Sequence, residues 1–405
     1  MIGSASINAL LVIFVLGALG LTLSLFVGTL TNTLAPCVIS FIGHAGLSIF
    51  IMYEFGLDAI GPDASSYHDV ASRMADAFAG TGPSVPFAEG KEGWIYVLGA
   101  IYLVFGKQPE AGLLVIAMMM AIVPAIMASS SRMMGWGSSA QTAAWFSVLL
   151  PALVIWPSSI LREGPSIFLL SLMVLAVGLY HLGRVVPAGA LLVAATFGMM
   201  WIRPTIGIAA LAGIALATIL VPWRRNTGTI GALVFLLPSM LALPFGLIRG
   251  GSAFDLTTAG TLRENLTLGA STSTGATSEG WDSFEGAALS MLHDLPGASF
   301  GPFLWQIGSQ PLTLAVDGVT FLALIILAVV ALRRSNLRRE VIALLLPSIG
   351  VLIVVAAAFG NYGFAVRQRS QAAVFLIPIA AAGWILLRQR HRPPTPQDEI
   401  ARTHA

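Results

Sequence analysis

The chain has 405 residues, of which 56% are hydrophobic and only 10% charged, whereas about a quarter of the residues of an ordinary soluble domain are charged. This composition excludes an ordinary soluble domain. The apolar residues form continuous runs of about 18 to 22, each long enough to cross a bilayer as a helix. Because backbone polar groups in lipid must be satisfied within the segment, the runs predict an all-α, polytopic helical bundle rather than a β-barrel, whose strands alternate in polarity.

The predicted spans alternate with basic span ends along the chain. We predict about eleven spans, at residues 5–27, 35–54, 110–131, 138–157, 164–183, 186–202, 205–222, 229–248, 314–333, 340–359 and 370–388. The positive-inside rule assigns to the cytoplasm the basic groups at Arg132, Arg184, Arg224–Arg225, Arg333–Arg339 and Arg388–Arg392. No charge separates the first two spans, so the amino-terminal topology stays open.

One transmembrane domain over residues 1–388 and a short cytoplasmic tail over 389–405 follow from this topology. Two segments, about 55–109 and 249–313, then stand outside. Only two lysines accompany the many arginines, alanines and glycines, a bias typical of GC-rich bacterial genomes. We therefore expect a multi-pass protein of a bacterial inner membrane, in contact with lipid and with no nucleic-acid partner.

The first outer segment opens with PDASSYHDVASRMADAFAG, residues 62–80. Apolar side chains recur there at helical spacing, and charged side chains take the other face, which predicts a helix lying in the membrane interface. Residues 93–107 are apolar but too short to cross comfortably, so they predict a second, interfacial or re-entrant helix. The two helices would form a pair in the first outer loop.

Asp63 directly precedes the first of these helices, and two roles are open to it. Its carboxylate can cap the free N–H groups of the helix. It can also stand at the membrane surface as a base that accepts a proton from a hydroxyl group. The two roles are compatible.

Several charged residues lie at span ends on the outer side, against the orientation preference. They are Arg162, Glu163, Arg203, Arg367 and Arg369. Each one alone could extend to lipid head groups or pair with an outer acid. As a group they predict a site for a phosphorylated head group, because a guanidinium forks onto phosphate oxygens.

Weaker candidates lie nearby. Lys91 and Glu92 are close in sequence to the first outer helix and could join the site. His293 and Asp294, in the second outer segment, are better read as loop structure. The sequence contains no metal-ligand cluster and predicts no cofactor. Whether a divalent metal assists the reaction stays open.

The order of these features resembles the GT-C class of integral-membrane glycosyltransferases, in its bacterial branch that uses polyprenyl-phosphate sugars. The stretches that carry the resemblance are PDASSYHDVASRMADAF, GWIYVLGAIYLVFG, PALVIWPSSILREGPSIFLL and GNYGFAVRQRSQAAVFLIP. Polysaccharide polymerases of capsule and O-antigen have a comparable layout, with outer arginines and an acidic first-loop element.

The resemblance implies that a sugar is moved from a polyprenyl phosphate or diphosphate carrier to a glycan or lipid acceptor, in synthesis of the cell envelope or of a polysaccharide. Asp63 would be the catalytic base. Arg203, Arg367 and Arg369, with Arg162, would bind the phosphate, and Glu163 would orient Arg162 or contact the sugar. The remaining expected substrate contacts are Tyr67, His68, Lys91 and Glu92.

Two other classes of function remain open. A transporter or flippase for lipid-linked sugars also needs arginines for phosphate, and predicts polar residues near mid-membrane and inverted repeats. The sequence shows no clear repeat, which favours the enzyme. A non-catalytic assembly subunit would have no enclosed polar cavity.

Overall fold

The fold is described from a computed structural model of residues 6–390, apart from residues 62, 86–91, 222–227, 242–243, 245–246, 248–254, 269–271, 275–277, 307–311 and 334–337. Within these residues the chain is helical, and its extended pairing is limited to one isolated bridge between Ser273 and Asn361. This confirms the predicted all-α class.

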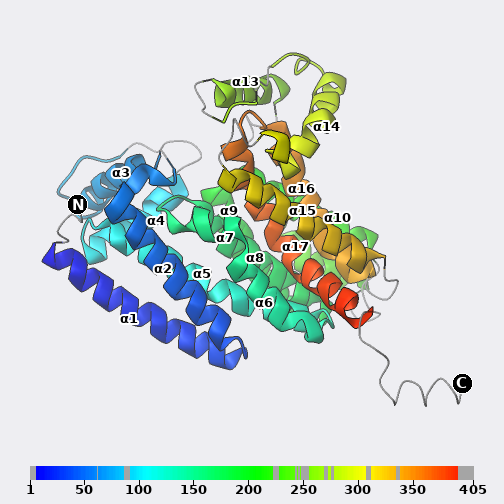
Figure 1. Cartoon of the computed structure of the whole chain (residues 1–405), viewed down its shortest axis with the longest axis horizontal. Coiled ribbons are helices and arrows are strands. Elements are labelled where there is room, and N and C mark those ends of the chain that lie inside the picture. Colours follow the sequence, from blue (N-terminus) through cyan, green and yellow to red (C-terminus); the bar gives the residue numbers. More distant parts are fainter. Residues whose placement is uncertain are drawn as a thin grey trace, which may run out of the picture.

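The long helices form one bundle (Figure 1). Eight of them are long and apolar enough to cross a membrane: α1 (Ile7–Leu30), α2 (Leu34–Phe55), α5 (Pro109–Met133), α8 (Glu163–His181), α9 (Val185–Ile202), α15 (Leu312–Leu332), α16 (Arg338–Ala357) and α17 (Tyr362–Arg390). These helices support a multi-pass membrane protein.

The predicted span 138–157 is not one straight helix. Instead, α6 (Ala140–Leu149) and α7 (Pro151–Ile155) meet at a break, and the two halves, with their flanking turns, differ in direction by 62°. Pro151 explains the break, because its ring removes a helical hydrogen bond and disfavours the helical conformation at the preceding residue. Counting this pair as one span gives nine.

Two further predicted spans are only partly supported. Helix α10 (Pro204–Leu220) is apolar but has 17 residues, and α11 (Gly228–Met240) has 13. Part of the predicted span 229–248 lies outside the described residues. The number of eleven spans therefore stays a prediction.

Helices α3 (Ala64–Phe78) and α4 (Glu92–Phe105) occur where the sequence predicts the outer pair. They pack against each other, and α4 also contacts α5 and α9. Tyr67, Ala71 and Met74 of the predicted apolar stripe are buried, whereas Phe78 at the helix end is exposed. A Cβ atom at Gly93 would collide with the carbonyl oxygen of Trp201, so this glycine permits the close approach of α4 to the end of α9.

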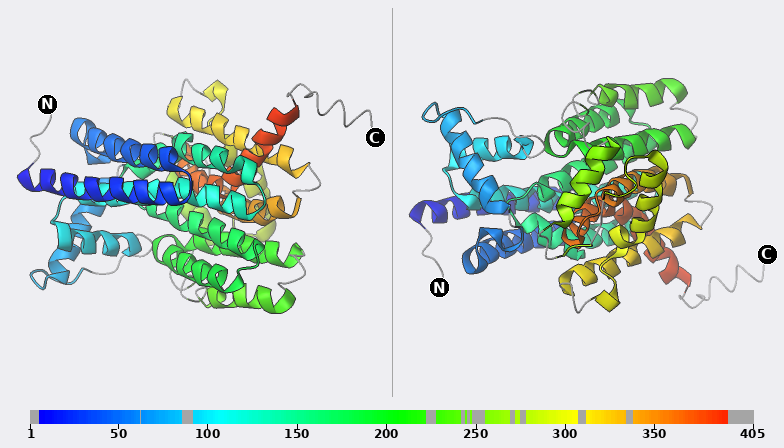
Figure 2. Two further views of the ribbon diagram at one scale, coloured as in Figure 1. Left: turned by 90° about the horizontal axis from the view of Figure 1, so that it is seen from below. Right: turned by 90° about the horizontal axis from the view of Figure 1, so that it is seen from above.

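The second segment predicted to be outside contains α13 (Leu256–Thr267) and α14 (Phe284–Phe300), which lie together at one end of the bundle (Figures 1 and 2). Buried Arg263 joins them through an ion pair with Asp294 at 2.6 Å and a hydrogen bond to Ser290. Asn361, just before α17, donates to the carbonyl oxygen of Leu266 at the end of α13. The segment is therefore fixed to the start of α17.

Candidate functional site

The cap of α3 is supplied by a residue other than the expected one. The side chain of Asp63 makes no capping hydrogen bond, whereas Asp58 accepts the backbone N–H of Ser65 at 2.8 Å. The capping role predicted for Asp63 is therefore wrong. Asp58 therefore supplies the carboxylate that accepts a backbone N–H at the start of α3.

Glu163 is the centre of a buried cluster of charges. It is the first residue of α8, where a carboxylate is favoured by the helix dipole, and its side chain is 0% exposed. Its Oε1 atom accepts from Nη2 of Arg203 at 3.0 Å and from Nε and Nη2 of Arg367 at 3.0 and 2.9 Å. One carboxylate oxygen thus accepts hydrogen bonds from two guanidinium groups that are far apart in sequence.

Arg203 enters this cluster from the junction of α9 and α10. It precedes Pro204, which disfavours helical backbone at the residue before it, and its φ and ψ of −155° and 76° are not helical. The helix is therefore interrupted at Arg203, between α9 and α10. The Nη1 atom of Arg203 donates to Oε1 of Gln368 at 2.8 Å, and the Arg203 side chain is only 4% exposed.

Asp63, Tyr67 and Arg162 lie around this cluster. Arg162 and Glu163 both act electrostatically on the Tyr67 hydroxyl, and Asp63 acts on Arg367. Burial is the main cause that raises the pKa of Tyr67, while the neighbouring arginines lower it. The structure therefore brings five of the predicted charged residues and one tyrosine together, from α3, α8, the α9–α10 junction and α17.

The arginines of the cluster differ in their access to a ligand. Arg367 keeps 20% of its side chain exposed and lies over the ring of Trp156, 5.6 Å from its centroid. Arg162 is also partly exposed. Arg203 is enclosed and uses both ends of its fork on protein atoms, so Arg367 and Arg162 are the guanidinium groups best placed to meet an anion.

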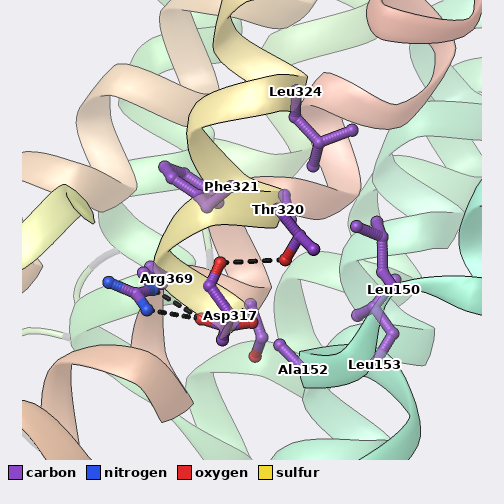
Figure 3. A pocket seen from close by; sticks show the side chains of 10 residues that line it. Leu150, Ala152, Leu153, Asp317, Thr320, Phe321, Leu324 and Arg369 are labelled. Carbon is purple, nitrogen blue, oxygen red and sulfur yellow. Dashed lines mark hydrogen bonds and ion pairs between the residues drawn. The ribbon is translucent and has the colours of Figure 1, made fainter. Parts of the chain in front are cut away.

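Arg369 does not belong to this cluster. It is fully buried and donates from Nε to Oδ2 of Asp317 at 2.7 Å (Figure 3). Its Nη1 also donates to the carbonyl oxygens of Ser299 and Gly301, at 3.2 and 2.6 Å. The pair lines a small cavity with Leu150 and other residues at the α6–α7 break. Arg369 therefore holds α14, α15 and α17 together.

His68, another predicted contact, instead packs against α4. His68 forms a hydrogen bond between Nδ1 and the hydroxyl of Tyr102 at 2.8 Å, on the side of α3 that faces α4. Burial lowers the pKa of His68, against the opposing effects of Asp69 and Glu110. Lys91 and the side chain of Glu92 lie outside the described residues.

Sequence reasoning missed three residues that bind or hold the predicted residues: Gln368, Asp317 and Asp58. Gln368 lies between two arginines that drew attention because of their charge, and a neutral amide gives no such signal. Asp317 could have been found, because an acid inside an apolar run indicates a buried partner. Asp58 had the residue type of a cap, but Asp63 stood closer to the expected helix start.

The described residues contain no group of three or more histidine, cysteine or acidic side chains that could hold a metal ion. In the arrangement of charges around Glu163, a carboxylate can accept a proton while a partly exposed guanidinium binds an anion. No family model matches the chain, and neither does any curated protein or solved structure.

Proposed function

We propose that this chain is an integral-membrane glycosyltransferase that takes its sugar from a polyprenyl-phosphate carrier on the extracytoplasmic face of a bacterial inner membrane. The observation that supports this most is the electrostatic interaction between Asp63 and Arg367. A carboxylate that makes no capping hydrogen bond acts on a guanidinium that is partly exposed and held by a buried acid. An acceptor hydroxyl and a carrier phosphate need these two groups next to each other.

The reaction requires one proton transfer and one displacement at carbon. Asp63 accepts the proton of the acceptor hydroxyl, whose oxygen forms a new bond to the anomeric carbon of the sugar. The bond from that carbon to the phosphate oxygen breaks, and the carrier leaves as polyprenyl phosphate. Arg367 and Arg162 stabilise the negative charge that develops on the leaving phosphate.

The direct test compares Asp63→Asn with wild type and with Asp69→Asn in lipid nanodiscs. Asp69 is an exposed acid on the same helix, so its substitution controls for loss of charge from α3. With radiolabelled polyprenyl-linked sugars and candidate acceptors, Asp63→Asn should lose at least a hundredfold in sugar transfer, while Asp69→Asn stays within about twofold. Equal transfer by Asp63→Asn and wild type would remove Asp63 from the role of base.

The same assay separates a single transfer from polymerisation. A product extended by one sugar or one repeat unit supports a glycosyltransferase acting once. A ladder of longer products would show the polysaccharide polymerase that shares the layout.

A transporter for lipid-linked sugars is the second candidate, and the buried pair of Asp317 and Arg369 is the observation that favours it. Charged pairs inside a helical bundle often mark a transport path. This pair is, however, saturated by carbonyl oxygens and by one another. Head-group translocation in sealed vesicles, with no carrier consumed, would establish the transporter.

A further inference from the structure

Gln368 joins the candidate site through Arg203 without touching its accessible side. It follows Arg367 on α17 and is 6% exposed. Its Oε1 atom accepts the Nη1 hydrogen bond of Arg203 at 2.8 Å, and the other end of the same guanidinium binds Glu163. Neighbouring residues of α17 thus hold the same buried carboxylate, one directly and one through Arg203.

Glu163 has unused bonding capacity in this arrangement. Both arginines bind its Oε1 atom, and its Oε2 atom, which is buried, has no hydrogen-bond partner within the part of the chain that the structure describes. The Nε atom of Arg203 is buried and unpartnered in the same way. A carboxylate and a guanidinium prefer a bidentate pair with two parallel bonds, which this geometry does not realise.

The acceptor on Gln368 excludes one of the two bidentate arrangements, the end-on pair in which Nη1 and Nη2 of Arg203 bind both oxygens of Glu163. While Nη1 of Arg203 is held by Gln368, only Nη2 of this end-on pair is left to bind Glu163. Without that acceptor, the buried guanidinium would keep an unsatisfied donor, which is costly inside a protein, most of all for a charged group. Rotation of Arg203 onto both oxygens of Glu163 would relieve this cost and displace Arg367.

We propose that Gln368 is a positioning residue. It holds Arg203 away from the second oxygen of Glu163 and thereby keeps Arg367 bound to Glu163 with part of its side chain exposed. This inference extends the proposed function, because it says how the anion-binding guanidinium is oriented. The effect of Gln368 on the orientation of Arg367 does not depend on which anion is bound.

The test substitutes Gln368 by Met, which keeps the length of the side chain and removes the acceptor. Gln371→Met is the matched control, since Gln371 is buried one turn further along α17 and its Oε1 atom accepts no hydrogen bond from an arginine within the described residues. Its amide donates only weakly to Oε1 of Gln368, at 3.4 Å, so this variant leaves the acceptor for Arg203 in place. In native membranes, the arginine reagent phenylglyoxal is followed at Arg367 by mass spectrometry. Gln368→Met should raise the rate of modification at Arg367 at least fivefold, and Gln371→Met should leave it within twofold of wild type.

Binding of a polyprenyl-phosphate sugar to the same nanodisc samples gives the second readout, measured without acceptor. Gln368→Met should weaken binding about tenfold, which corresponds to about 1.4 kcal/mol. Faster modification with unchanged carrier binding would support the positioning role and count against the carrier as the ligand. Unchanged modification of Arg367 would overturn the positioning role whatever the ligand.

A second variant keeps the test decisive if Gln368→Met fails to reach the membrane. Gln368→Ser keeps a polar group that is too short to reach Arg203, and should give the same faster modification of Arg367. Gln368→Glu restores an acceptor at full length and should return the modification rate to near that of wild type. Equal rates for the Ser and Glu variants would contradict the inference.

Discussion

Arg367 and Arg369 are two positions apart on α17, yet they have different surroundings. Residues two apart on a helix point about 200° from each other, so the two side chains leave on opposite faces. Arg369 faces the α14–α15 side, is fully buried, and ends on one carboxylate and several carbonyl oxygens. Arg367 faces α8, shares its carboxylate with Arg203, and keeps a fifth of its side chain exposed.

The comparison shows that charge and sequence position do not by themselves identify a ligand-binding arginine. What differs is how many hydrogen-bond donors the protein already satisfies. A guanidinium whose donors are taken by carboxylate and backbone stabilises the fold, and one with a donor left at the surface can meet an anion. We expect the greatest change when the Asp317–Arg369 pair is broken, and progressively smaller changes from variants at Arg367, Asp58 and His68.

Breaking the buried pair should cost the most stability. Asp317→Ala leaves Arg369 as an uncompensated charge in the bundle and should lower the free energy of unfolding by about 3–5 kcal/mol. Unfolding in detergent, followed by tryptophan fluorescence, measures this loss. The double variant Asp317→Leu with Arg369→Met should recover most of it, because an apolar pair needs no counter-charge; a double variant no more stable than Asp317→Ala would contradict the structural role.

Arg367→Lys should instead impair function more than folding. Lysine keeps the positive charge but loses the planar fork that spans Glu163 and an anion, so binding of a polyprenyl-phosphate sugar should weaken about 10- to 100-fold. Its free energy of unfolding should fall by less than that of Arg369→Lys, whose fully buried fork has more bonds to lose. A greater loss of stability in Arg367→Lys than in Arg369→Lys would contradict the assignment of Arg369 to the fold and of Arg367 to a ligand.

The capping of α3 gives a smaller effect. Asp58→Ala removes the acceptor for the N–H of Ser65 and should destabilise α3 by about 1 kcal/mol. Faster amide hydrogen exchange in the first turn of α3 checks this. Asp63→Ala should leave that exchange unchanged, and equal acceleration in both variants would return Asp63 to the role of a cap.

The pH dependence of His68 should be the mildest effect. Its pKa in the folded protein is lowered by burial, so the neutral imidazole is favoured and the unfolded chain binds a proton first. The stabilising contribution is therefore complete above the ordinary pKa of about 6.5 and is lost as the pH falls from there through the lower folded value. The melting temperature should drop less between pH 8 and pH 5 in His68→Gln than in wild type. An equal drop would show that His68 does not titrate within the fold.

The helical class and the amphipathic α3 could be predicted from the sequence, because burial follows apolar periodicity along one element. Tyr67, Ala71 and Met74 are buried as that periodicity requires. The outer charges were also visible, since charge inside an apolar chain is costly and conspicuous. Their partners were not, because the bond between Glu163 and Arg367 joins residues 204 positions apart.

Sequence could not divide the arginines into two clusters either. That division depends on how α17 is rotated in the bundle, which is set by packing against α8, α15 and α16 rather than by the sequence of α17 alone. The break at Pro151 was readable from the rule for proline, but the length of the apolar run suggested one continuous span.

The convergence of the cluster on Glu163 has a consequence for the order of synthesis. The ribosome makes Glu163 and Arg203 long before α17, which carries Arg367 and Gln368 and ends the described chain. The early helices can therefore enter the membrane with the negative charge of Glu163 already neutralised by the positive charge of Arg203. The last helix then adds the excess positive charge, so the proposed anion site is complete only after α17 has been inserted.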